Sequence, residues 1–119
     1  MSKSARSVFL FSLYMFGLGT ILVLVPNVLL GLFGLPETTE VWIRVVGMLI
    51  LILGFYYFKA SKNNMNVFFE WTVYGRAAVL IFFIVFVLVG FAPPVLILFG
   101  LIDALAAFWT YKCLQSEKL

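Results

Sequence analysis

The sequence predicts an all-α membrane protein: a four-transmembrane-helix bundle with both termini cytoplasmic and a short interfacial helix between the first and second spans. Of its 119 residues, 65% are hydrophobic and 11% are charged, whereas soluble domains are about 45–50% apolar and about 25% charged. The apolar residues form four runs, each long enough to cross a bilayer core as a helix. The basic residues gather at particular ends of these runs, which is a topology signal.

A single domain is expected over residues 1–119, with spans at about residues 8–25, 41–60, 67–91 and 94–113. The first run holds 18 residues without a charge. Tyr14 and Gly17 fall on one face of it at helical spacing, so Gly17 is expected to lie against a neighbouring helix. Pro26 ends or kinks this helix because its ring is incompatible with a helix interior.

Residues 27–36 are apolar but too short to span. Asn27 has the side chain of an N-cap, and Gly34 followed by Pro36 is typical of a helix end. This segment therefore predicts a helix of one or two turns at the outer interface or folded back against the bundle. Glu37 follows, in a short acidic stretch suited to the start of the next helix.

The second span carries a stripe at helical spacing that includes Arg44, Gly47 and Gly54. Glycines in such a stripe let another helix approach closely. The third span begins near Trp71, and Arg76 lies about 7–8 Å further along the helix axis. From residue 77 to residue 89 this span has no polar side chain.

A very short turn, which contains Pro93 and Pro94, connects the third and fourth spans and makes them antiparallel neighbours. Proline is compatible with the first turn of the helix that follows. The fourth span carries its own stripe at intervals of three and four residues, formed by Gly100, Asp103, Ala107 and Thr110. Apart from Asp103, each member is small or carries a hydroxyl group.

The charges flanking the spans indicate the orientation. Three segments are basic: the N-terminus, the connection between the second and third spans, and the C-terminus, through Lys3, Arg6, Lys59, Lys62, Lys112 and Lys118. The connection between the first and second spans has two glutamates and no lysine. Cytoplasmic segments carry the excess of Lys and Arg, so both termini are expected in the cytoplasm and the protein in the plasma (inner) membrane.

Asp103 is the candidate centre of the bundle, because a carboxylate at the middle of a span costs about 2.5–3.5 kcal/mol on insertion scales. Arg76 is the better-supported partner, since it lies on the neighbouring helix, and Arg44 is the second. Either arginine can instead extend to the lipid headgroups. Tyr14 and Thr110 complete the candidate polar cluster. The cluster is consistent with a structural lock, with a binding or transport site, or with catalysis.

Histidine is absent, which removes the commonest general base and metal ligand. No metal site, cofactor or catalytic residue is therefore predicted, and the sequence leans away from an enzyme. A nucleic-acid partner would need a soluble basic face, which the chain lacks. The expected partners are the lipid bilayer and a second copy of the chain or a larger membrane protein.

Several short motifs together resemble small bacterial four-helix membrane proteins of the DoxX-like type and related uncharacterised families. They are Leu32-Phe33-Gly34-Leu35-Pro36, Arg44-x-x-Gly47, Leu53-Gly54-x-Tyr56-Tyr57, Gly75-Arg76, Phe99-Gly100-x-x-Asp103 and Trp109-Thr110. Such families are largely without assigned activity, and some members are associated with redox or stress-response partners. The resemblance implies an accessory role.

Three functional hypotheses follow from the sequence. The first is a binding or accessory subunit of a membrane assembly. The second is a small carrier or binding protein for a lipid or small amphipathic molecule, with Asp103 and Arg76 or Arg44 lining the site. The third is a membrane enzyme that acts on a lipid-soluble substrate.

Overall fold

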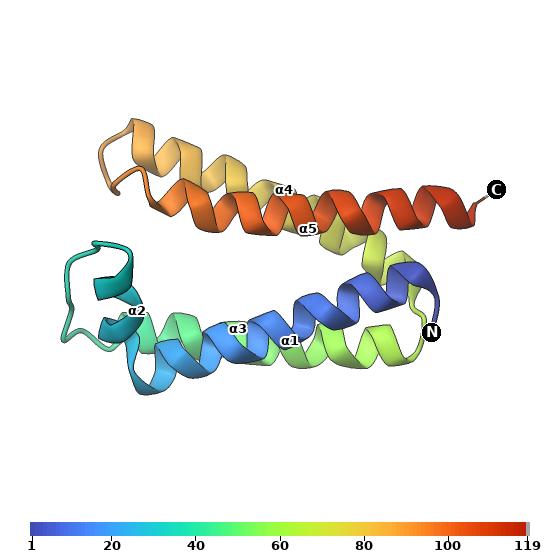
Figure 1. Cartoon of the computed structure of the whole chain (residues 1–119), viewed down its shortest axis with the longest axis horizontal. Helices are drawn as coiled ribbons and strands as arrows, with labels where there is room; N and C mark the ends of the chain where they lie inside the picture. Colours follow the sequence, from blue (N-terminus) through green and yellow to red (C-terminus); the bar gives the residue numbers. More distant parts are fainter. Residues whose placement is uncertain (119) are drawn as a thin grey trace. The chain divides into compact units, whose positions relative to one another are not determined.

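A computed structural model describes residues 1–118, and these residues form five helices and no strand. The helices are α1 (Lys3–Leu24), α2 (Pro26–Leu32), α3 (Trp42–Lys62), α4 (Asn66–Leu88) and α5 (Leu96–Glu117) (Figure 1). All but α2 are long and apolar enough to cross a membrane. The all-α class and the four apolar helices are thus as the sequence predicts.

The chain divides into two compact units. Unit 1 contains Met1–Val8 together with the chain from Ala60 onward, and unit 2 contains Phe9–Lys59. The first turns of α1 therefore belong to unit 1, and the rest of α1 belongs to unit 2.

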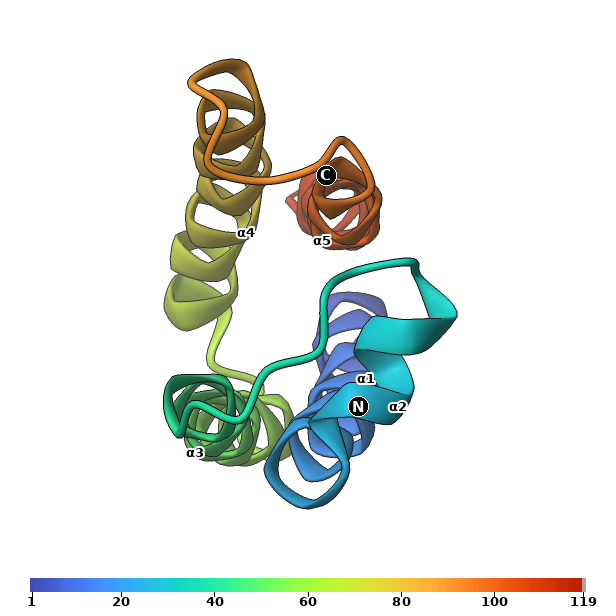
Figure 2. The same cartoon turned by 90° about the vertical axis from the view of Figure 1, so that its left-hand side faces the viewer.

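In unit 1, α4 and α5 lie side by side and antiparallel (Figures 1 and 2). The end of α4 explains the reversal: Gly90 has a φ of +85°, and the amide of Phe91 donates to the carbonyl of Phe86 at 2.9 Å. This is the Schellman arrangement, which favours glycine because its backbone turns left-handed. The prediction that the short turn makes these helices neighbours is confirmed.

In unit 2, α1 and α3 meet at a pair of glycines. A Cβ built on Gly19 would lie 2.9 Å from the carbonyl oxygen of Gly47, and a Cβ built on Gly47 would lie 2.9 Å from that of Gly19. These distances are shorter than ordinary carbon–oxygen contacts, so the two backbones touch only because both residues lack a side chain. Ring contacts such as Phe9 with Phe58, 5.7 Å between centroids, line the other half of this helix pair.

The α2 helix follows directly from Pro26, which stands at its first turn. Asn27 does not serve as the N-cap that the sequence suggested, because it already lies within the helix. Its side chain instead makes two hydrogen bonds to the backbone of Thr38, from Nδ2 to the carbonyl at 3.1 Å and from the Thr38 amide to Oδ1 at 2.9 Å. Asn27 therefore anchors the segment that connects α2 to α3.

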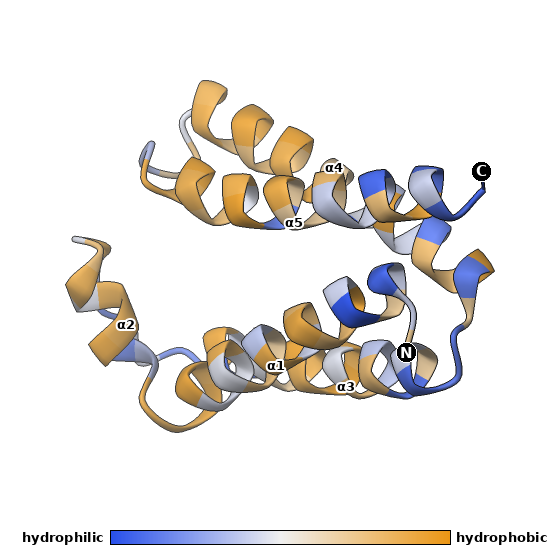
Figure 3. Ribbon diagram, turned by 45° about the vertical axis from the view of Figure 1, so that its right-hand side comes forward, coloured by the Kyte–Doolittle hydropathy of each residue, from blue (hydrophilic) through white to orange (hydrophobic). Residues whose placement is uncertain are grey.

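The α1 helix begins at Lys3, five residues before the span expected from hydropathy. The first amides of a helix have no partner within it, and here the amide of Ser4 donates to Glu117 Oε1 at 2.9 Å. Hydropathy underestimates this helix because its first turn is stabilised by a residue at the far end of the chain. The hydrophilic residues of unit 1 gather at this end, where α5 terminates (Figure 3).

Candidate functional site

Arg76, on α4 in unit 1, is a buried cation that forms several hydrogen bonds. Only 2% of its surface is exposed. Its Nε donates to the carbonyl oxygen of Thr72 at 3.2 Å, and its Nη2 donates to the hydroxyls of Thr72 and Thr110, each at 3.0 Å. The guanidinium therefore links α4 to α5 instead of extending to the headgroups, which was one of the sequence-based alternatives.

The hydrogen bonds continue from Thr110 to the start of α1. The Ser7 hydroxyl donates to the carbonyl oxygen of Ser4 at 2.7 Å and pairs with the Thr110 hydroxyl, also at 2.7 Å. Because a hydroxyl has one proton, Thr110 must be the donor to Ser7. The chain of donors thus runs from Arg76 through Thr110 and Ser7 to the backbone of α1.

In this chain each group donates to the next in one direction, and the first donor is the Arg76 cation. Charge-assisted hydrogen bonds are stronger than neutral ones, and successive hydrogen bonds polarise one another. Thr110 and Ser7 are both fully buried, with 0% and 1% of their surface exposed. The network therefore fixes the rotation of α4, α5 and the first turn of α1 within unit 1.

Asp103 lies about two turns into α5, on the stripe that also contains Gly100, Ala107 and Thr110. Gly100 faces α4, since a Cβ placed on it would lie 3.0 Å from Leu80 Cα, and Ala107 and Thr110 are buried. Asp103 itself is half-buried. The stripe predicted from spacing therefore includes the surface through which α5 packs on α4.

Arg76 and Asp103 lie on the two helices that pack together in unit 1, α4 and α5. The hydrogen bonds resolved for the described residues nevertheless bring Arg76 to Thr72 and Thr110, and none of them involves the Asp103 carboxylate. Asp103 is thus on the helix next to a buried positive charge without being hydrogen-bonded to it. An ion pair between these two residues stays a prediction, as does one between Asp103 and Arg44.

Arg44 has a different role, within unit 2. Its Nη1 donates to the carbonyl oxygens of Val23 and, at 3.3 Å, Leu24. These carbonyls lie at the end of α1, where Pro26 interrupts the helix and leaves acceptors without an intrahelical donor. A cation at a helix C-terminus is also favoured by the helix dipole. Arg44 therefore caps α1.

The remaining residues predicted for the cluster and the packing stripes are distributed as follows. Tyr14 is in unit 2, where its ring stacks on Phe11 at 5.4 Å between centroids. A Cβ on Gly54 would meet Met15 and Phe16 at 3.2 Å. Gly17 is exposed and a Cβ there would meet nothing within 4 Å; the close approach runs through Gly19, which the sequence did not single out.

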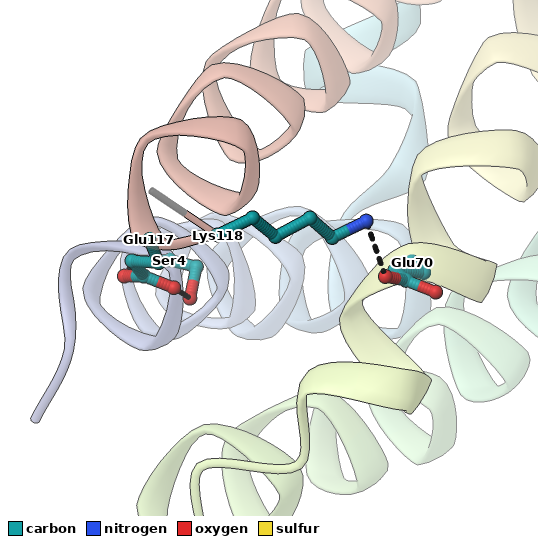
Figure 4. Close-up of polar contacts among 4 residues, drawn as sticks. All are labelled: Ser4, Glu70, Glu117 and Lys118. Carbon is teal, nitrogen blue, oxygen red and sulfur yellow. Dashed lines mark hydrogen bonds and ion pairs between the residues drawn. The ribbon is translucent and has the colours of Figure 1, made fainter.

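The ends of the described chain carry a second polar group. The Ser4 hydroxyl donates to Glu117 Oε2 at 2.7 Å, and Lys118 forms an ion pair of 3.2 Å with Glu70 (Figure 4). The amide of Ser2 donates to Asn64 Oδ1 at 3.2 Å. The N-terminus, the α3–α4 connection and the end of α5 are therefore joined at one end of unit 1.

Sequence reasoning missed Ser4, Ser7, Thr72 and Glu117. The signal was present in part, because Ser4 and Ser7 are three residues apart, as Thr72 and Arg76 are four apart, and such pairs share a helix face. No cluster of three or more His, Cys, Asp or Glu side chains that could hold a metal ion occurs within residues 1–118.

Comparison with known proteins gives no relative. No family model matches the chain, and neither a curated protein nor a solved structure matches it.

Proposed function

We propose that this chain is a multi-pass integral membrane protein that acts as a binding or accessory subunit of a membrane assembly. In this proposal it lies in the plasma (inner) membrane with both termini cytoplasmic, and α2 lies at the outer interface. The partner is a second copy of the chain or a larger membrane protein.

One observation carries this proposal: Asp103 is a half-buried carboxyl group within a spanning helix and takes no part in the hydrogen bonds resolved among residues 1–118. In hydrocarbon, a polar group without a hydrogen-bond partner costs several kcal/mol. Ionisable residues within spans are functional candidates for this reason. A donor side chain supplied by another subunit would meet the requirement.

The surface of α4 supports the same proposal. Only 11% of its spanning segment is buried within the chain, and the exposed side chains include Tyr74 at 76% and Phe82 at 59%. Between them lies Gly75, where a Cβ would meet nothing within 4 Å. A flat glycine site flanked by bulky residues suits the close approach of a further helix.

The orientation is supported by the contacts at the chain ends. Ser4 and Glu117 are hydrogen-bonded, so the two termini share one end of unit 1, and four spans require termini on one side of the membrane. This end includes the basic residues that favour the cytoplasm. In α2 and just after it, Leu32 is 77% exposed and Phe33 is 38% exposed, as suits a segment in contact with lipid.

Purification in a mild detergent tests the proposal. The wild-type chain is expected to elute as a homo-oligomer or with a co-purifying membrane protein. Asp103→Asn is expected to weaken that association about tenfold, since hydrogen bonds between spanning helices contribute about 1–2 kcal/mol. Glu37→Gln, which neutralises a carboxylate outside the spans, is the matched control and should leave the association unchanged.

Two results would contradict the proposal. The first is a wild-type chain that is strictly monomeric and carries no other protein. The second is an association that Asp103→Asn and Glu37→Gln affect equally. Circular dichroism and thermal unfolding of each variant establish that the fold is retained.

A second candidate function is a small carrier or binding protein for an amphipathic molecule. It is favoured by the placement of Asp103 and Arg76 on two helices that pack together, because opposite charges within spanning helices suit a ligand with a polar group. Under this alternative, Asp103→Asn abolishes ligand binding and leaves the oligomeric state unchanged. Membership of the DoxX-like group would fit either candidate, and it remains a proposal.

A further inference from the structure

A small hollow lies between the first half of α4 and the last half of α5, away from Asp103. Its volume is about 120 Å³, and its lining includes Glu70, Val73, Tyr74, Tyr111, Leu114 and Lys118. Leu114, with 5% of its surface exposed, is the most deeply buried of these side chains. The hollow therefore combines an apolar floor with a rim of opposite charges and two phenol groups.

The charges at the rim are accessible. Lys118 Nζ lies 3.2 Å from Glu70 Oε1, and the side chains are 61% and 42% exposed. Figure 4 shows the lysine reaching across from the end of α5 to the glutamate on α4. Exposed ion pairs contribute little to stability, typically 0–1 kcal/mol. A ligand that offers both a cation and an anion can therefore replace this pair at small cost.

The surroundings of the hollow are those of a membrane interface. Tyr74 is 76% exposed and Tyr111 is 45% exposed, and Trp71 on the neighbouring turn of α4 is 65% exposed. Tyrosine and tryptophan concentrate at the level of the lipid headgroups. The apolar side chains of Val73 and Leu114 lie within one helical turn of the two tyrosines, so the hollow has apolar contact surface at this level.

We propose that this hollow binds the headgroup of a phospholipid that carries a primary ammonium group, such as phosphatidylethanolamine. The phosphate is bound by Lys118 and the ammonium by Glu70, with the tyrosine hydroxyls as further donors to the phosphate. An anionic headgroup without an ammonium meets repulsion from Glu70. A choline headgroup has no N–H to donate to the Glu70 carboxylate. This proposal does not rest on the association proposed for Asp103, and Tyr74 borders both surfaces.

Lipid retention tests the proposal. The full chain in mild detergent is mixed with equal amounts of phosphatidylethanolamine, phosphatidylglycerol and phosphatidylcholine that share the same acyl chains. After removal of free lipid, each species retained per protein is measured by mass spectrometry. The wild type should retain phosphatidylethanolamine about tenfold over the other two, a ratio that corresponds to about 1.4 kcal/mol.

Two charge variants separate the role of Lys118 from that of Glu70. Lys118→Gln should lower the retention of phosphatidylethanolamine about tenfold, to the level of the other lipids. Glu70→Gln should remove the preference for phosphatidylethanolamine over phosphatidylglycerol without lowering the retention of phosphatidylglycerol. Lys62→Gln and Glu37→Gln, which make the same charge changes outside the hollow, are the controls and should behave as the wild type.

Equal retention of the three lipids by the wild type would overturn the proposal. So would a loss of preference in Lys62→Gln as large as that in Lys118→Gln, because it would indicate a general effect of positive charge. Each variant is first required to elute from size exclusion at the wild-type position. The rim residues are exposed, so their substitution is not expected to prevent folding.

Discussion

In unit 1, α4 and α5 are joined through a buried cation and two threonine hydroxyls, whereas in unit 2, α1 and α3 meet at two glycines whose backbones touch. The first contact is directional, because each donor must point at its acceptor. The second depends on shape alone, because dispersion and close approach supply its energy.

The comparison extends to the two arginines. Arg76 is 2% exposed and joins two helices in unit 1, while Arg44 is exposed and caps the end of α1 in unit 2. Residue type and distance from a span end are therefore poor guides to the role of a charge. What decides the role is which acceptors the fold leaves without a donor.

The largest effect is expected from removing the buried cation. Arg76→Leu should destabilise the protein by about 3 kcal/mol, since it removes the charge-assisted hydrogen bonds that Arg76 donates to Thr72 and Thr110. Arg44→Gln should cost about 0.5–1 kcal/mol, the typical value of a cation at a helix C-terminus. Unfolding by a denaturing detergent, followed by tryptophan fluorescence, measures both. If Arg76→Leu and Arg44→Gln lowered the free energy of unfolding equally, the buried arginine of unit 1 would contribute no more to stability than the exposed arginine of unit 2.

The glycine contact gives the next largest effect. Gly47→Ala should cost about 1–3 kcal/mol, because its Cβ would lie 2.8 Å from Leu22 Cβ and α1 would have to shift. Gly17→Ala is the matched control on α1: it meets nothing and should stabilise by about 0.5–1 kcal/mol through helix propensity. The same unfolding measurement applies, and a loss of stability in Gly17→Ala would show that its exposed face is covered.

A third effect, smaller than that of Arg76→Leu, is expected where the network of unit 1 reaches α1. Thr110→Val keeps the shape of the side chain but leaves an Arg76 N–H without its acceptor and the Ser7 hydroxyl oxygen without its donor, at a cost of about 1–2 kcal/mol. Thr20→Val is the control in unit 2, since its exposed hydroxyl bonds only within its own helix, to the carbonyl of Phe16. If Thr110→Val and Thr20→Val lost the same amount of stability, the hydrogen bonds between helices would not be what stabilises unit 1.

Much of the local structure follows from the sequence. Apolar runs predict four helices because a helix satisfies its own backbone in a membrane. Pro26 and the short turn around Gly90 mark helix ends for reasons of backbone geometry. The stripe of Gly100, Ala107 and Thr110 is also found by spacing, since helical residues three and four apart share a face.

The partners of the polar residues could not be predicted in the same way. The N-terminal turns of α1 were underestimated because hydropathy does not include Glu117, 113 residues away from the Ser4 that it caps. Gly17 and Gly19 are equivalent by composition, and only the rotation of α1 against α3 selects Gly19 for the contact.

By itself, the sequence determined that this chain forms four apolar helices, and that Arg76 lies within the third and Asp103 within the fourth. It could do so because hydrophobicity and helix geometry are local properties. Only the tertiary structure decided that Arg76 donates to Thr72 and Thr110, that Arg44 caps α1, and that Glu117 caps Ser4. Hydrogen bonds act over about 3 Å and at fixed angles. Their partners are therefore set by how the helices pack, which a pattern along one helix does not contain.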